Sequence, residues 1–217
     1  NSISLTNDCL IIGSNASGKS TFIKAVAVNA ILAQTIYTCT ATRFHLRPSL
    51  TVTSMAVRDD ITAGDSYFIT EIKSMKRILD RCAAFPCLCV IDEILKGTNT
   101  IERIAASASV LLHLHEQPNC LCIAASHDIE LTALLKNQYD SYHFSEQIDD
   151  TGIRFDYTLK EGPSQTRNAI RLLEYMEFPA NVVAQANQLV TQYEETETWV
   201  PFHPKTAAAQ KDIIPPG

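Results

Sequence analysis

The stretch CLIIGSNASGKSTFIKAV, residues 9–26, decides how the rest of this chain is interpreted. Its first four residues, Cys9–Ile12, form an apolar run that is typical of a buried strand. The next eight, Gly13–Ser20, have the spacing GxxxxGKS, in which two glycines allow a tight turn that aims backbone N–H groups inward. At the N-terminus of a helix, such a loop cradles phosphate. The stretch therefore predicts nucleotide binding rather than a chance glycine and serine turn.

Two residues of this loop have specific expected tasks. We expect the Lys19 ammonium to reach the β- and γ-phosphates and the Ser20 hydroxyl to hold Mg²⁺. The residues expected to bind the nucleotide are Gly13, Ser14, Asn15, Ala16, Ser17, Gly18, Lys19, Ser20 and Thr21.

Composition and charge narrow the class of protein. The 217 residues are 46% hydrophobic, which is typical of a globular domain, and the net charge of -6 argues against a broad basic face for nucleic acid. Because we find no apolar run of membrane-spanning length and no secretory leader, we expect a cytoplasmic protein without a membrane partner. The first residue is Asn1 rather than methionine, so we expect a domain cut from a longer protein.

Strand-like and helix-like segments alternate along the first two thirds of the chain. Expected strands are 51–57, 87–91 and 120–126, and expected helices are 19–34, 66–82, 100–115 and 129–136. This order predicts an α/β fold with a mostly parallel sheet flanked by helices. The runs YDSYHFSEQI and IRFDYTLKEG alternate polar and apolar residues, and we expect an antiparallel pair at one edge of the sheet.

The sequence divides into three expected regions. We expect a nucleotide-binding core at 1–163, a C-terminal helical segment at 164–195 and a flexible tail at 196–217. Apolar residues at helical spacing predict two helices between Thr166 and Tyr193, broken at Phe178-Pro179.

A second chemical centre follows the strand CLCVID. Adjacent carboxylates, Asp92 and Glu93, end this strand and resemble a Walker B motif. Asp92 is then expected to hold Mg²⁺, and Glu93 to orient and deprotonate the attacking water. The alternative is a solvated acidic turn, which a complete phosphate loop elsewhere in the chain makes less favourable.

A third centre follows the strand CLCIAAS. This strand ends in His127, whose imidazole is placed to donate a hydrogen bond to a γ-phosphate and so report its presence. A lone histidine after a strand is more often incidental. Its position after the Walker B strand favours the functional interpretation.

The seven cysteines include two CxC pairs. Cys87 and Cys89 share one face of their strand, as do Cys120 and Cys122. A metal site across the two strands is conceivable. The CxC spacing is not the CxxC of zinc sites, however, so packing as small hydrophobic side chains is the favoured interpretation.

These centres, in this order, resemble the ATPase domain of the MutS family of DNA mismatch repair proteins, which are ABC-type ATPases. The loop keeps the family's asparagine at Asn15, and DDITAGDSYFITEI resembles the MutS signature segment, with Gly64, Ser66, Phe68 and Glu71 in step. DEILKGTNT and AASHDIELT resemble further family segments, and the transporter signature LSGGQ is absent. The resemblance runs from Asn1 to about Val190.

The resemblance implies a mechanism. The ligands are ATP and Mg²⁺, with Lys19, Glu93 and His127 as catalytic residues. Two copies would pack head to tail as a homodimer, so that Gly64 and Ser66 of one chain complete the ATP site of the other. Ser66 has an alternative role as the N-cap of a helix. Residues 164–195 would then help dimerisation.

The expected function is an ATPase that couples dimer closure to movement of a DNA clamp, through DNA-binding domains absent from this chain. Two alternatives stay open. One is a MutS-like ATPase acting on recombination junctions or ribosomes, and the other is a nucleotide-gated dimerisation module with little turnover. Ser14, Ala16, Ser17 and Tyr67 depart from the family pattern, which makes this a divergent member.

Overall fold

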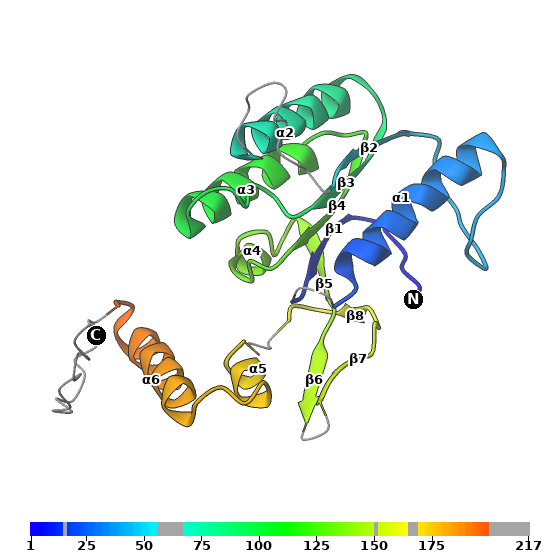
Figure 1. The fold of residues 1–217 in the computed structure, drawn as a ribbon. Coiled ribbons are helices and arrows are strands. Elements are labelled where there is room, and N and C mark those ends of the chain that lie inside the picture. The colour runs from blue at the N-terminus through cyan, green and yellow to red at the C-terminus, as the bar shows by residue number, and fades with distance from the viewer. Residues whose placement is uncertain (15–16, 56–66, 150–151, 165–168, 200–217) are drawn as a thin grey trace, which may run out of the picture. The chain divides into compact units, whose positions relative to one another are not determined.

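The computed structural model describes residues 1–14, 17–55, 67–149, 152–164 and 169–199. Several predicted positions lie outside these residues: Asn15, Ala16, Gly64, Ser66 and the tail beyond 199. The described residues fall into two compact units, the first within 1–147 and 153–166 and the second within 148–152 and 167–217. Figure 1 shows the elements of both units.

The first unit is built on a six-stranded sheet in the order β2-β3-β4-β1-β5-β8. Its strands pair in parallel except for β5 and β8, which pair antiparallel at one edge. The strands are β1 Asp8–Ile12, β2 Leu50–Ser54, β3 Cys87–Asp92, β4 Cys120–Ser126, β5 Tyr139–His143 and β8 Lys160–Glu161. The mixed α/β class with a mostly parallel sheet is therefore confirmed.

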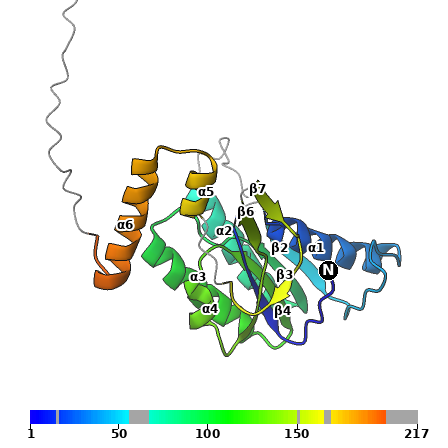
Figure 2. The ribbon, with the colours of Figure 1, turned by 90° about the horizontal axis from the view of Figure 1, so that it is seen from below.

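Helices cover both faces of this sheet. The helices are α1 Lys19–Thr35, α2 Tyr67–Ala84, α3 Thr100–His115 and α4 Glu130–Leu134. Figures 1 and 2 show α1 on one face and α2, α3 and α4 on the other. The alternation of side chains along each strand separates two cores, because Leu10 and Ile12 join the cluster under α2 and α3, whereas Cys9 and Ile11 join the cluster under α1.

The predicted antiparallel pair is divided differently in the structure. The first half of YDSYHFSEQI is β5, which pairs in parallel with β1 on one side. On its other side β5 pairs antiparallel with β8, the end of IRFDYTLKEG, so the predicted antiparallel edge is confirmed there. The second half begins β6 Glu146–Asp149, which pairs with β7 Gly152–Phe155 as a separate two-stranded sheet. The alternation was identified correctly, but alternation does not specify which strand is the partner.

Two helices follow in the second unit. They are α5 Ala169–Tyr175 and α6 Ala180–Thr196, which contact each other and are separated at Phe178-Pro179. Pro179 caps α6, as expected for a residue that lacks a backbone donor. Among the helices that the structure describes, none is long and apolar enough to cross a membrane.

Candidate active site

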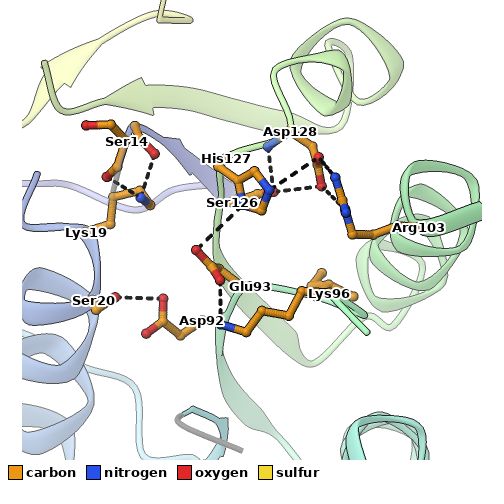
Figure 3. Close-up of polar contacts among 12 residues, drawn as sticks. Ser14, Lys19, Ser20, Asp92, Glu93, Lys96, Arg103, Ser126, His127 and Asp128 are labelled. Atoms are coloured by element: carbon orange, nitrogen blue, oxygen red, sulfur yellow. Dashed lines mark hydrogen bonds and ion pairs between the residues drawn. The ribbon is translucent and has the colours of Figure 1, made fainter. Parts of the chain in front are cut away.

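The candidate site lies at the carboxyl ends of three adjacent strands, β3, β4 and β1. Parallel pairing aligns their carboxyl ends, so the residues that follow them are brought together. Figure 3 shows the phosphate loop after β1, the carboxylates after β3 and the histidine after β4 in one cluster. The three centres, which lie far apart in the sequence, therefore meet in space.

The loop after β1 has the backbone that its glycines permit. Gly18 has a φ of 108°, in the left-handed region, and stands at the N-terminus of α1. A side chain at Gly13 would meet Ser17 Oγ at 2.8 Å and the Phe144 carbonyl at 2.9 Å. Ser17 Oγ is itself buried and has no hydrogen-bond partner among the described residues. A tight loop with an unsatisfied buried hydroxyl fits the binding of a phosphate group.

Lys19 is buried and points along the loop. Its Nζ donates to the carbonyl oxygens of Gly13 at 2.6 Å and Ser14 at 2.7 Å. Burial lowers the pKa of Lys19, because the charged form loses hydration there. Ser14 is fixed in turn, since its hydroxyl donates to Glu146 at 2.8 Å.

Ser20 and Asp92 supply a pair of oxygen atoms beside the loop. The Ser20 hydroxyl donates to Asp92 Oδ1 at 3.0 Å, which joins the first turn of α1 to the end of β3 (Figure 3). A hydroxyl and a carboxylate oxygen at this separation suit the hard-oxygen preference of Mg²⁺. The residues present therefore fit the metal that the sequence predicts. Among the described residues, no group of three or more His, Cys, Asp or Glu could hold a metal by itself.

Glu93 follows Asp92 with an unusual backbone. Its φ is 60°, in the left-handed region that non-glycine residues rarely adopt, and its N–H donates to the Ala125 carbonyl at 2.9 Å. This conformation turns the Glu93 side chain towards its partners. Glu93 Oε1 lies 3.6 Å from His127 Nδ1, and Oε2 accepts from Lys96 Nζ at 2.6 Å.

The charges of His127 and Lys96 change the pKa of Glu93, and the charge of Glu93 changes the pKa of His127. The facing His127 imidazole and the Lys96 ammonium lower the pKa of Glu93 to about 2. The Glu93 carboxylate in turn raises the pKa of His127. Glu93 is therefore ionised at neutral pH, and its negative charge favours the protonated imidazole.

A second ion pair supports the histidine. Arg103 on α3 donates to both carboxylate oxygens of Asp128, at 2.9 and 2.6 Å, and these side chains are only 13% and 6% exposed. The Asp128 N–H also donates to Ser126 Oγ at 3.0 Å. Ser126 and Asp128, the residues on either side of His127, are therefore fixed by these hydrogen bonds. Sequence reasoning missed this pair, because the two residues lie 25 positions apart and belong to no shared motif.

Helix α2 contacts the loop that carries Glu93. Glu71 is 3% exposed, and its Oε2 accepts a hydrogen bond from the Gly97 N–H at 3.1 Å. A side chain at Gly97 would come within 3.0 Å of Phe68 Cβ, so only glycine fits against α2 here. Glu71 and Phe68 were noted in the sequence as signature residues without an assigned task.

The phosphate loop also borders a groove of about 2060 Å³, whose lining includes Lys19, Thr21, Glu93 and Tyr157. Tyr157 was not predicted as a site residue. Its ring lies over Gly18, where a Cβ would be 3.2 Å from Tyr157 Cδ1, and the residue is 57% exposed. An exposed aromatic ring beside a phosphate loop offers a surface on which a nucleotide base can stack.

Comparison with known proteins gives a consistent family. Residues 9–194 match the family described as MutS domain V. The chain is 30% identical over 206 residues to "DNA mismatch repair protein MutS 2" of Haloarcula marismortui, covering 93% of this chain and 22% of that protein. It is 31% identical to "DNA mismatch repair protein MutS" of Natronomonas pharaonis, covering 94% of this chain and 23% of that protein. It is 26% identical to "DNA mismatch repair protein MutS" of Bacillus cereus strain Q1, covering 96% of this chain and 25% of that protein. The chain thus spans about a quarter of these relatives.

Proposed function

Because this chain belongs to the MutS domain V family, we propose that it is the ATP-binding and ATP-hydrolysing domain of a MutS-like DNA mismatch repair protein. The observation that carries the proposal is the meeting of Lys19, the Ser20–Asp92 pair and the Glu93–His127 pair at one sheet edge. A phosphate loop that faces an ionised carboxylate suits the hydrolysis of a nucleoside triphosphate. The fold is accordingly proposed to be a P-loop ATPase of the ABC type.

The loop residues have proposed binding tasks. Lys19 leaves the carbonyl oxygens of Gly13 and Ser14 and donates to phosphate oxygens, while the backbone N–H groups of the loop hold the same phosphates. Ser20 and Asp92 hold Mg²⁺, which when bound neutralises charge on the β- and γ-phosphates. Tyr157 supplies a stacking surface for the adenine base.

Glu93 and His127 act on the water and the γ-phosphate. Glu93 is ionised, so its carboxylate can accept a hydrogen bond from the O–H of a water molecule, but its low pKa makes it a weak base. Glu93 therefore contributes mainly by orienting that water. His127, whose pKa is raised by Glu93, donates a hydrogen bond to the γ-phosphate.

The remaining parts of the proposal concern partners. Two chains form a head-to-tail homodimer in which Gly64 and Ser66 of one chain complete the site of the other. Residues 1–163 are the ATPase core, 164–195 help dimerisation and 196–217 form a tail. DNA is bound by other domains of a longer cytoplasmic protein, and ATP-driven closure moves them as a clamp.

A second candidate function is a nucleotide-gated dimerisation module with little turnover. The observation in its favour is that Glu93 is held on both sides, by Lys96 at 2.6 Å and by His127 at 3.6 Å. A carboxylate retained in this way would not reach the attacking water. Both candidate functions predict that the chain binds ATP, but only the first predicts appreciable ATP hydrolysis.

The test measures ATP binding by titration calorimetry and phosphate release by a coupled assay. We expect Lys19→Ala to weaken binding about a hundredfold, and Glu93→Gln to bind ATP normally but hydrolyse it about a hundredfold more slowly. Glu116→Gln, an exposed change at the end of α3, is the control. Binding without phosphate release in the unaltered chain would favour the second candidate.

Sedimentation tests the proposed dimer separately. Glu93→Gln is examined without nucleotide, with ADP and with ATP-Mg²⁺, each with and without Ser66→Ala. We expect ATP alone to produce a dimer and Ser66→Ala to abolish it. A mass that never depends on ATP, although ATP binds, would remove the trans role of Ser66.

A further inference from the structure

Five cysteines form a thiol cluster in the amino-terminal halves of β3 and β4: Cys82 in the last turn of α2, Cys87 and Cys89 on β3, and Cys120 and Cys122 on β4. Cys87 lies directly opposite Cys120 in the parallel register of the two strands. The Sγ atoms of Cys82 and Cys120 are 3.5 Å apart, within hydrogen-bonding distance for sulfur. The cluster occupies the edge of the sheet opposite the candidate active site.

The two sulfurs that lie closest differ in exposure. Cys82 is 3% exposed, whereas Cys120 is partly open to solvent at the start of its strand. A reagent from solution can therefore reach Cys120 and not Cys82. Of the cysteines in the structure, all seven are free thiols.

The neighbouring thiols act on the chemistry of Cys120. Hydrogen bonds from Cys82 and Cys89 stabilise the Cys120 thiolate and lower the pKa of Cys120 to about 6. The ordinary value for cysteine is about 8.5. The lowered pKa favours the Cys120 thiolate, which is the form that reacts with oxidants. The hydrogen bond to Cys120 is the largest cause that raises the pKa of Cys82, to about 11, so Cys82 stays protonated.

We propose that Cys120 is a peroxide-reactive thiol and Cys82 its resolving thiol, so that oxidation joins α2 to β4 through a disulfide. The contact between a reachable sulfur and a shielded one, 3.5 Å apart on two different elements, carries the proposal. A metal centre is the other use of clustered thiols. No group of three or more His, Cys, Asp or Glu that could hold a metal ion occurs among the described residues, which favours redox chemistry for these thiols.

The first chemical step oxidises Cys120. Its thiolate attacks one oxygen of hydrogen peroxide, the O–O bond breaks, and Cys120 becomes a sulfenic acid as hydroxide leaves and takes a proton to form water. The hydrogen bond that Cys82 gave to the thiolate is lost, and with it the largest cause of its raised pKa.

The second step joins the two sulfurs. The Cys82 sulfur attacks the Cys120 sulfur, the S–S bond forms, the S–O bond breaks, and a second water leaves with the Cys82 proton. Two thiols are oxidised by two electrons, and one peroxide is reduced to two waters. A dithiol reductant reverses the step by exchange.

The test treats the whole chain with a small excess of hydrogen peroxide, blocks the remaining thiols with N-ethylmaleimide and identifies linked peptides by mass spectrometry. We expect loss of two free thiols, a Cys82–Cys120 linkage and full recovery with dithiothreitol. Cys39, the other partly exposed cysteine, is the internal control and should stay free. Equal oxidation of Cys39 and Cys120, or absence of the linkage, would overturn the proposal.

Variants separate the two roles. Cys82→Ala should leave a sulfenic acid on Cys120 that a dione probe captures, whereas Cys120→Ser should leave the other cluster thiols unreacted. Iodoacetamide tests the nucleophile in the unaltered chain, where the Cys120 alkylation rate should be half-maximal near pH 6. A half-maximal rate near the ordinary value of cysteine would count against the proposal even if a variant failed to fold.

Discussion

The backbone N–H of Gly97 donates a hydrogen bond to the buried carboxylate of Glu71, with a distance of 3.1 Å between Gly97 N and Glu71 Oε2. This bond joins the first turns of α2 to the loop between β3 and α3, which also carries Glu93 and Lys96. The Phe68 side chain packs against the same glycine. The position of the candidate hydrolytic carboxylate therefore depends on a helix that lies outside the phosphate loop.

Removing this contact should affect hydrolysis more than binding. We expect Glu71→Ala to lower the ATP hydrolysis rate about tenfold and to change the ATP dissociation constant less than about twofold, because the loop behind Glu93 loses a fixed point. Glu71→Gln keeps an oxygen acceptor and should restore most of the rate. The measurements are steady-state phosphate release and titration calorimetry. Equal losses in the Ala and Gln variants would mean that the charge, rather than the hydrogen bond, matters.

The Glu93–His127 pair predicts a pH window for stability. Glu93 has a lowered pKa in the folded chain, so its contribution is present above about pH 4.5 and is lost as the pH falls towards 2. His127 has a raised pKa, so its contribution is present below about pH 6.5 and is lost as the pH rises through the folded value. The Tm difference between the unaltered chain and Glu93→Gln should therefore be largest between about pH 4.5 and 6.5.

Thermal unfolding at a series of pH values between 3 and 9 checks this window. Lys76→Ala, which removes an exposed ion pair with Asp80, is the control and should change Tm little at every pH. A Tm difference for Glu93→Gln that is the same at pH 3 and pH 5.5 would show that the pair contributes nothing to stability.

Removing only one partner of the Arg103–Asp128 pair should lower the free energy of unfolding markedly. Both side chains are largely buried, so Asp128→Ala leaves the guanidinium without its partner, and we expect a loss of about 3 kcal/mol in unfolding free energy. Arg103→Lys should also destabilise, because lysine cannot make the two parallel hydrogen bonds. Urea unfolding measures both. The double variant Arg103→Met with Asp128→Leu should lose less than the sum of the single changes, and strict additivity would contradict the pairing.

Local pattern was enough to predict the sheet and the meeting of the three centres. An apolar run followed by GxxxxGKS predicts a strand, a loop and a helix, and parallel strands then bring the loop beside Asp92, Glu93 and His127. The roles of these residues stay predictions.

Long-range pairs could not be predicted in the same way. Glu71 and Gly97 are 26 positions apart, Arg103 and Asp128 are 25 apart, and neither pair follows a helical or strand period. Their formation depends on how α2 and α3 pack on the sheet. The division of the predicted antiparallel pair has the same origin, since alternation alone does not show that β5 pairs with β8 in the main sheet while β6 pairs with β7 in a separate sheet.

The same long-range folding brings Tyr157 over the phosphate loop, and it gives the last prediction. Its ring is 57% exposed and lies against Gly18, so a stacked adenine would cover it. We expect Tyr157→Ala to weaken ATP binding about tenfold, in line with a stacking contribution of about 1–3 kcal/mol, and Tyr157→Phe to bind almost normally. Inorganic triphosphate lacks a base, so neither variant should change its binding affinity appreciably.

Competition titrations with ATP and triphosphate make the distinction, with Tyr37→Ala as the matched control. Tyr37 is 92% exposed and does not line the groove, so its removal changes the amount of aromatic surface without touching the candidate site. If Tyr157→Ala weakened ATP and triphosphate to the same extent, the ring would be supporting the loop backbone at Gly18 rather than contacting the base. If only ATP binding weakened, the stacking role would hold, because the two ligands differ only in the nucleoside.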